Sequence, residues 1–350
     1  MSRHRDHLMG VLREILGSLP GLDSLELAAG DPEGGADLRL RRHGQSVGLQ
    51  VKVLTQGYPR DVRNAAAHLD SGRKAKDEET RALVGAPSLS PGARKLLQER
   101  GIAYWDSGGS LFLPLPWGVY LVDRPAPQVG DRRGRELFRG ASSRVLHTLM
   151  NETGRSWKGT DLARAAGVSK ATVSRVLGLL ERNLWGGGEG EGHGAPFRLQ
   201  RPGELLDAWA ACHTLRDRVL HRFHTPAPSA ARIERSALQF LEASRADYAL
   251  TLESGGARRA PFSTVSRYVA ALVLPGLDWG PLADGSDFRP VEGGGNLLLI
   301  EVPDSAPLMY RERIGEAWVA SPVQLYLDLH AWPRRGREQA AHLREVCLGY

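Results

Sequence analysis

The chain has 350 residues, 41% of them apolar, with 46 basic and 40 acidic side chains and a net charge of +6. This apolar content excludes a disordered chain, and the length predicts two or three domains. Two cysteines exclude a disulfide framework, the apolar runs are too short to span a membrane, and the charged start (MSRHRDHLMG) lacks a signal-peptide pattern. We therefore expect a cytoplasmic protein without a membrane partner.

The excess positive charge is concentrated in one segment. Residues 131–183 carry 11 basic and 5 acidic side chains, a net charge of +6. Residues 1–130 carry 17 basic and 15 acidic side chains (+2), and residues 184–350 carry 18 and 20 (−2). A local basic segment on an otherwise balanced chain indicates a surface for a polyanion such as nucleic acid.

The residues before the proline-rich segment 124–127 predict alternating helices and strands, the pattern of an α/β domain. Leu8, Leu12, Ile15 and Leu16 recur at helical spacing, and Pro20-Gly21 ends that helix. Further helices are predicted at 60–69 and 90–100, the latter with Ser90 as N-cap. Strands are predicted at 36–42, 47–54, 82–86, 102–105, 110–113 and 119–122.

The first two strands form a predicted hairpin with a charged face. With the turn at Gly44-Gln45, the expected pairs are Leu38 with Val51, Leu40 with Leu49, Asp37 with Lys52 and Arg39 with Gln50. Because strand side chains alternate between faces, Asp37, Gln50 and Lys52 should converge on the face opposite the leucines.

An Asp followed on the next strand by (D/E/Q)-x-K resembles the PD-(D/E)XK nuclease fold. The resemblance implies that Asp37 and position 50 hold Mg²⁺, that Lys52 stabilises charge or positions the attacking water, and that Glu14 is an extra acidic group. Position 50 is Gln, a weaker ligand for a hard cation, although some nucleases of this superfamily use QxK. We prefer a degenerate fold kept for nucleic-acid or protein contact over an active nuclease.

Residues 160–183 (TDLARAAGVSKATVSRVLGLLERN) predict two short helices joined by a tight turn. Gly167 permits the turn because glycine adopts a positive φ at little cost, and Ser169 can cap the second helix. The expected buried stripe of that helix consists of Val173, Val176, Leu177 and Leu180. This leaves polar side chains on its outward N-terminal face, which in a recognition helix meets base edges: Ser169, Lys170, Thr172, Ser174 and Arg175.

A glycine-rich stretch (186–194) follows, between Trp185 and a short returning strand at Phe197–Leu199. With the preceding helix, predicted at 135–150, this arrangement resembles the winged helix-turn-helix domains of bacterial transcription regulators, for which GVSKATVSRVL is a typical pattern. Arg139 and Arg144 on the preceding helix are expected to contact phosphates, and the resemblance implies that His193 and Arg198 in the wing contact the flanking backbone or the minor groove.

The last 125 residues predict a mixed α+β domain. Helices are expected at 231–244, 264–272, 322–329 (with Ser321 as its N-cap) and 336–346, and a strand is expected at 297–302. The run VASPVQLYLDL (319–329), together with the turn Asp106-Ser107-Gly108-Gly109, resembles the AbiEi-family antitoxins of type IV toxin–antitoxin systems. Members bind DNA at their own promoters and are paired genetically with a nucleotidyltransferase-like toxin.

Several polar residues outside these motifs have structural interpretations. Asp106 is expected to cap its turn, and Asp328 to be structural. His213, His221 and His224 include an i, i+3 pair, but no carboxylate or thiolate completes a metal site, so we expect surface histidines.

The sequence therefore predicts a multidomain α/β + α protein: a restriction-endonuclease-like α/β domain (1–125), a central winged helix (131–225) and an AbiEi antitoxin C-terminal-like α+β domain (226–350). We expect a sequence-specific double-stranded DNA-binding regulator that represses its own or nearby promoters, not an enzyme, without a cofactor. A nucleotidyltransferase-like toxin and a second copy of the chain are its possible protein partners. The alternative left open is a Mg²⁺-dependent endonuclease or DNA-repair protein using Asp37, Gln50 and Lys52.

Overall fold

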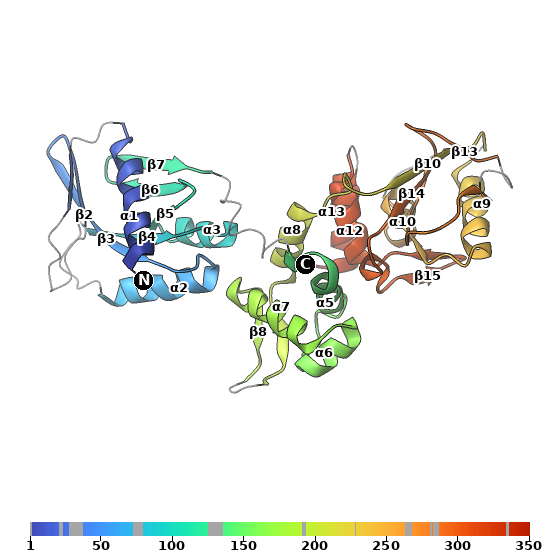
Figure 1. The fold of residues 1–350 in the computed structure, drawn as a ribbon, viewed down its shortest axis with the longest axis horizontal. Helices are drawn as coiled ribbons and strands as arrows, with labels where there is room; N and C mark the ends of the chain where they lie inside the picture. Colours follow the sequence, from blue (N-terminus) through green and yellow to red (C-terminus); the bar gives the residue numbers. More distant parts are fainter. Residues whose placement is uncertain are drawn as a thin grey trace. The chain divides into compact units, whose positions relative to one another are not determined.

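The chain divides into two compact units, Met1–Gly134 with Gly178–Leu184, and Arg135–Leu177 with Trp185–Tyr350. The expected boundary between residues 225 and 226 falls inside the second unit. The computed structural model (Figure 1) describes residues 2–20, 24–27, 38–72, 80–124, 136–190, 194–227, 229–262, 268–280, 282, 287–333 and 336–350. Within those ranges, no helix has both the length and the apolar character needed to cross a bilayer.

The first unit is built on a seven-stranded sheet in which the strands follow one another in chain order. The strands are β1 (Ser24–Leu27), β2 (Leu38–Arg42), β3 (Gln45–Val53), β4 (Thr80–Ala86), β5 (Ala103–Asp106), β6 (Leu111–Leu115) and β7 (Gly118–Val122). β3, β4 and β5 are parallel, and the strands on either side of them run antiparallel. This mixed sheet confirms the α/β class predicted for the first part of the chain.

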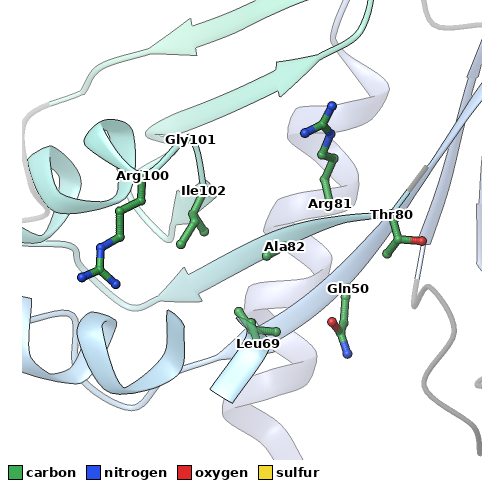
Figure 2. Close-up of a pocket in the computed structure, with 8 residues that line it drawn as sticks. All are labelled: Gln50, Leu69, Thr80, Arg81, Ala82, Arg100, Gly101 and Ile102. Carbon is green, nitrogen blue, oxygen red and sulfur yellow. The ribbon is translucent and has the colours of Figure 1, made fainter. Parts of the chain in front are cut away.

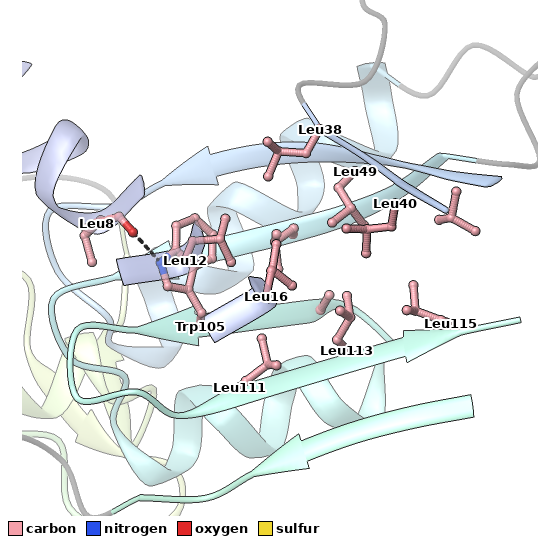
Figure 3. Close-up of a cluster of buried hydrophobic side chains, with 13 residues drawn as sticks. Leu8, Leu12, Leu16, Leu38, Leu40, Leu49, Trp105, Leu111, Leu113 and Leu115 are labelled. Atoms are coloured by element: carbon pink, nitrogen blue, oxygen red, sulfur yellow. Dashed lines mark hydrogen bonds between the residues drawn. The ribbon is translucent and has the colours of Figure 1, made fainter. Parts of the chain in front are cut away.

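Helices cover both faces of this sheet (Figure 1). On one face α1 (Ser2–Gly17) buries Leu8, Leu12 and Leu16 against leucines of β2, β3 and β6. The indole Nε1 of Trp105 donates a 3.0 Å hydrogen bond to the carbonyl oxygen of Leu8, which fixes the helix on the sheet (Figure 3). On the other face α2 (Pro59–Gly72) and α3 (Pro91–Glu99) cover Val84 and other apolar side chains of β4 and β5.

The register of the β2–β3 hairpin differs from the prediction by two residues. Leu38 pairs with Leu49 and Arg39 with Gly48, not with Val51 and Gln50. The turn lies one residue earlier than expected, at His43 and Gly44, both with positive φ, and this displacement shifts the pairing by two residues. Since side chains alternate with period two, a shift of two residues keeps the apolar side chains on the same face.

The second unit begins with three helices and a small hairpin: α5 (Gly140–Asn151), α6 (Gly159–Ala166), α7 (Lys170–Arg182), β8 (Gly186–Gly188) and β9 (Phe197–Leu199), followed by α8 (Pro202–Cys212). The last residues of α7, from Gly178, are grouped with the first unit. α5 starts five residues later than the predicted helix at 135–150.

A second seven-stranded sheet forms the rest of this unit, in the order β13-β10-β14-β12-β11-β16-β15. Its strands are β10 (Leu220–His224), β11 (Tyr248–Leu250), β12 (Val269–Val273), β13 (Arg289–Pro290), β14 (Leu297–Glu301), β15 (Glu312–Ile314) and β16 (Ala317–Val319). The helix predicted at 264–272 is wrong, because its described part belongs to β12. All five residues of β12 are buried between two neighbouring strands, and such a continuous apolar run has no period that separates strand from helix.

Helices accompany the second sheet: α9 (Ala230–Ala243), α10 (Leu252–Arg259), α12 (Pro322–Ala331) and α13 (Gly336–Leu343), with a 3-10 turn η1 (Ala306–Leu308) and a π-helical turn η2 (Arg344–Leu348). Ser321 caps α12 as predicted, through its hydroxyl and the N–H of Gln324 at 3.2 Å. α12 packs against both α5 and α8, so the C-terminal part of the chain supports the helices that precede the sheet.

Leu12 tests the packing of the first sheet. We expect Leu12→Ala, which empties a fully buried position, to lower the free energy of unfolding by about 2–5 kcal/mol in urea denaturation. Arg13→Ala, on the exposed side of the same helix, should change it by less than about 0.5 kcal/mol. Equal effects of the two substitutions would contradict the placement of α1.

Candidate nucleic-acid interface

The turn between α6 and α7 has the geometry predicted from Gly167. This glycine closes α6 in the left-handed region, at φ 61° and ψ 43°. Its N–H points back to the carbonyl oxygens of Ala163 and Arg164, and the N–H of Val168 donates to Ala163 at 3.0 Å. The last carbonyl groups of α6 are therefore satisfied within the turn.

Arg144 of α5 locks this turn from the side. Its Nε donates to the carbonyl oxygen of Ala166 at 2.8 Å, and its Nη2 lies 2.7 Å from the place where a Cβ on Gly167 would stand. The Arg144 side chain is half-buried and also approaches the hydroxyl of Ser305 at 3.5 Å. The phosphate contact of Arg144 stays a prediction, and in the structure its Nε is engaged within the helix turn.

Ser169 caps α7 through its side chain. Its hydroxyl oxygen accepts the N–H of Thr172 at 3.1 Å and lies 3.0 Å from the Thr172 hydroxyl. Both hydroxyls are therefore engaged with each other at the start of the helix. A ligand that contacts either hydroxyl must therefore compete with the hydrogen bonds that Ser169 and Thr172 already make.

α7 has one buried and one exposed face. Val173, Val176 and Leu180 are at most 2% exposed, as predicted, whereas Leu177, predicted to be buried with them, is half-buried. Ser169, Lys170, Ser174 and Arg175 are exposed, and Thr172 is half-buried. Among the described residues Lys170 has no ion pair, whereas Arg175 donates through Nη2 to the buried Ser142 hydroxyl at 3.2 Å.

The β8–β9 hairpin is attached to the segment before α6. Trp157 and Phe197 exchange two backbone hydrogen bonds of 2.8 Å, so the loop at Trp157 acts as a third strand beside β9. A Cβ at Gly186 would stand 2.5 Å from the Phe197 ring, so the close packing of the hairpin requires glycine there. The hairpin and the α6 entry are therefore held together by backbone contacts.

Arg198 lies on the exposed face of β9 and is paired within the hairpin. Its Nη1 donates to Oε1 of Glu189 at 3.0 Å, and the Ser156 hydroxyl donates to the other oxygen of that carboxylate. These hydrogen bonds, from Ser156 and then Arg198, hold the pKa of Glu189 below its usual range. Glu189 was not predicted as a site residue, because the glycine-rich sequence around it does not indicate that its carboxylate pairs with Arg198.

The other predicted contacts have simple outcomes. Arg139 is exposed and precedes α5 as its N-cap residue, so its guanidinium is accessible at the start of that helix. His193 lies outside the described residues. The exposed residues that were predicted to contact DNA therefore come from the start of α5, the start of α7 and β9.

The nuclease-like pattern of the first unit is described only in part, because Asp37 lies outside the described residues. Gln50 and Lys52 share the face of β3 opposite the α1 side, with Lys52 exposed. Gln50 lines a cavity of about 610 Å³ with Leu69, Thr80, Arg81, Ala82, Arg100, Gly101 and Ile102 (Figure 2). In Figure 2 the Arg81 side chain extends to the opposite side from Gln50.

The described polar groups that line this cavity are poor ligands for Mg²⁺. They are the neutral amide of Gln50, the hydroxyl of Thr80 and the cationic side chains of two arginines, whereas Mg²⁺ prefers carboxylates. Glu14 is exposed on α1, the helix that covers the other face of the sheet. Among the described residues no group of three or more His, Cys, Asp or Glu side chains has a metal-binding arrangement.

Comparisons with known proteins give little support to any family. No protein-family model matches the sequence, and no curated protein matches it either. One solved structure, the crystal structure of a repair endonuclease from Pyrococcus abyssi, matches with 23% identity over 29% of this chain and a TM-score of 0.21. The matched region spans 46% of that endonuclease, less than half its length. A similarity this low carries no argument about the fold or the activity of this chain.

Asp328 is the centre of a buried polar cluster in the second unit. Its carboxylate is fully buried and accepts hydrogen bonds from His213 Nε2 (2.9 Å), Gln324 Nε2 (2.7 Å) and Thr251 Oγ1 (2.6 Å). This confirms a structural role for Asp328. His213 is not an ordinary surface histidine, since its side chain is only 11% exposed. Asp106 caps its turn as predicted, accepting the N–H groups of Gly108 and Ser110.

His147 lies on α5 within the same unit and is fully buried. Its ring meets Trp209 edge-on at 4.9 Å, and its Nδ1 has no hydrogen-bond partner within the described ranges. Burial, reinforced by the nearby His213, lowers the pKa of His147 to about 3. The imidazole is therefore neutral in the folded protein throughout the physiological pH range.

Gly167 offers a direct test of the turn. We expect Gly167→Ala to lower the free energy of unfolding by about 1–3 kcal/mol, because alanine disfavours the left-handed conformation and its Cβ displaces the Arg144 guanidinium. Gly178→Ala is the matched control within α7: nothing lies within 4 Å of its Cβ position, and alanine should stabilise the helix by about 0.5–1 kcal/mol. Denaturant unfolding measures both values. Two effects of the same sign would contradict the assigned turn.

His147 makes the stability of the second unit sensitive to acid. In the unfolded chain His147 takes up a proton near pH 6.5, whereas in the folded chain it does not. The contribution of neutral His147 to the free energy of unfolding is therefore complete above pH 6.5 and decreases as the pH falls below that value. Between pH 7.5 and pH 5 the free energy of unfolding should fall by about 2 kcal/mol from this residue. In urea denaturation His147→Phe should remove that loss, and His224→Phe, at an exposed position, should retain it. An unchanged pH dependence in His147→Phe would contradict the burial of a neutral imidazole.

Proposed function

We propose that the chain is a sequence-specific double-stranded DNA-binding regulator, in which α5, α6, α7 and the β8–β9 hairpin form a winged helix-turn-helix. The observation that carries the proposal is that α7 has one buried apolar face and one exposed polar face. Its apolar side is buried, and its first turns expose Ser169, Lys170, Ser174 and Arg175 on a helix whose start is fixed by the Gly167 turn.

The dimensions and chemistry of this surface suit the major groove. The groove is about 12 Å wide and admits one α-helix, whose N-terminal residues then reach the base edges. Lys170 can donate to guanine O6 or N7, and the hydroxyl of Ser174 can donate or accept. Arg139 and Arg198 lie at the start of α5 and on the hairpin, where they are suited to phosphates flanking the groove.

We further propose that the regulator is of the AbiEi antitoxin type, with a nucleotidyltransferase-like toxin as its genetic partner. This part rests on the resemblance of the run at 319–329 and of the turn at 106–109. A neighbouring gene for such a toxin, and suppression of its toxicity on co-expression with this chain, would support the proposal. Toxicity unchanged by co-expression would contradict it.

A second candidate function, nucleic-acid processing by the first unit, rests on the face of β3 that Gln50 and Lys52 share, although the cavity beside Gln50 lacks the carboxylates that Mg²⁺ prefers. Gln50 and Lys52 are adjacent on one face of β3, as a PD-(D/E)XK-like site requires. If the unit is a nuclease, Mg²⁺ or Mn²⁺ should permit cleavage of duplex, single-stranded or branched DNA, and Lys52→Ala should abolish it. Absence of cleavage on every substrate would leave DNA binding as the sole function proposed.

Lys170 tests the leading proposal. Selection from a random duplex library should yield one preferred sequence, and fluorescence anisotropy should then show that Lys170→Ala weakens binding to it by about 1–3 kcal/mol, or roughly 5- to 150-fold. Lys95→Ala removes the same charge from an exposed position on α3 and should have little effect. Failure to select any sequence, or equal effects of the two variants, would contradict the proposal.

A further inference from the structure

Glu189 occupies a fixed position at the end of β8. Its backbone N–H donates to the carbonyl oxygen of Pro196 at 2.7 Å, which holds the residue across the hairpin from β9. Its carboxylate accepts one hydrogen bond from Arg198, at 3.0 Å, and another from the Ser156 hydroxyl. The carboxylate thus engages two hydrogen-bond donors, Arg198 and Ser156, that could otherwise donate to a phosphate oxygen.

The ion pair is accessible and easily opened. The side chains of Arg198 and Glu189 are 48% and 41% exposed, and ion pairs at such positions are weak because water and salt screen them. Glu189 is ionised at neutral pH, and the hydrogen bonds from Ser156 and Arg198 lower its pKa further. A phosphate brought close to the hairpin can therefore replace the carboxylate as the partner of Arg198.

We propose that Glu189 is a specificity-determining residue of the hairpin, whose carboxylate competes with a DNA phosphate for Arg198 and Ser156. This inference rests on the proposed DNA-binding function. While the pair is closed the Arg198–Glu189 unit has no net charge, so the hairpin contributes little to binding of random duplex. A phosphate displaces Glu189 only when α7 is seated on its preferred sequence and holds the duplex against β9.

Glu189→Gln removes the competing charge with little change in size. Anisotropy titrations should show about threefold to tenfold tighter binding to a random duplex, with the slope of log K against log salt steeper by about one phosphate contact. The gain on the preferred sequence should be smaller, because Arg198 already reaches phosphate there in the native chain. The ratio of specific to non-specific affinity should therefore fall.

Glu204→Gln is the matched control. Glu204 pairs with Arg201 at 3.2 Å, with both side chains about half exposed (56% and 53%), but it lies on α8 outside the hairpin. The control makes the same change in net charge and should leave both affinities nearly unchanged. Thermal unfolding of both variants checks that neither changes the fold.

Arg198→Ala completes the test, because Glu189→Gln should have almost no effect in that background. The inference is overturned if Glu189→Gln and Glu204→Gln act alike, if the gain persists without Arg198, or if the gain on the preferred sequence equals that on random DNA. These outcomes leave Lys170-dependent binding intact, so they are distinguishable from failure of the proposed function. A native chain that binds no duplex overturns both.

Discussion

The orientation of α7 depends on the positive φ of Gly167 and on the guanidinium of Arg144 packed against it. A helix can present side chains to a groove only if its axis is fixed, and here α6 ends on the glycine while Arg144 satisfies the carbonyl of Ala166. The apolar side chains Val173 and Val176 then hold the helix on its buried face. Both the polar surface of α7 and the direction in which it points follow from this turn.

The structure changes the meaning of the local positive charge. The net charge of +6 in residues 131–183 suggested a basic footprint, yet Arg144 is used to secure a turn and Arg175 donates to Ser142. Arg198, just beyond that segment, is neutralised by Glu189. Lys170 is the residue on α7 that lacks such an internal partner within the described ranges. The proposed interface therefore depends on a few side chains in fixed positions and not on a broad region of positive charge.

Features decided by neighbouring residues could be predicted from the sequence, and features decided by distant ones could not. The caps at Ser90, Ser169 and Ser321 depend on hydrogen bonds three residues away, and all three form as expected. The hairpin register was missed because a turn at Gly44-Gln45 and a turn at His43-Gly44 fit the same alternation of apolar and polar side chains. The hydrogen bonds that Asp328 accepts from His213 and Thr251 join residues 115 and 77 positions apart, which no local pattern reveals.

That buried carboxylate has a consequence for the order in which the chain matures. During synthesis the residues of α5, α6 and α7 emerge early, but α12, which packs against α5 and α8, is made long after them. His213, which follows α8, can form its hydrogen bond to Asp328 only after more than a hundred further residues have been added to the chain. A nascent chain of this protein carries the residues of α5, α6 and α7 before α12 has been made, so in ribosome-bound fragments α5 lacks the contact with α12 that it makes in the finished chain.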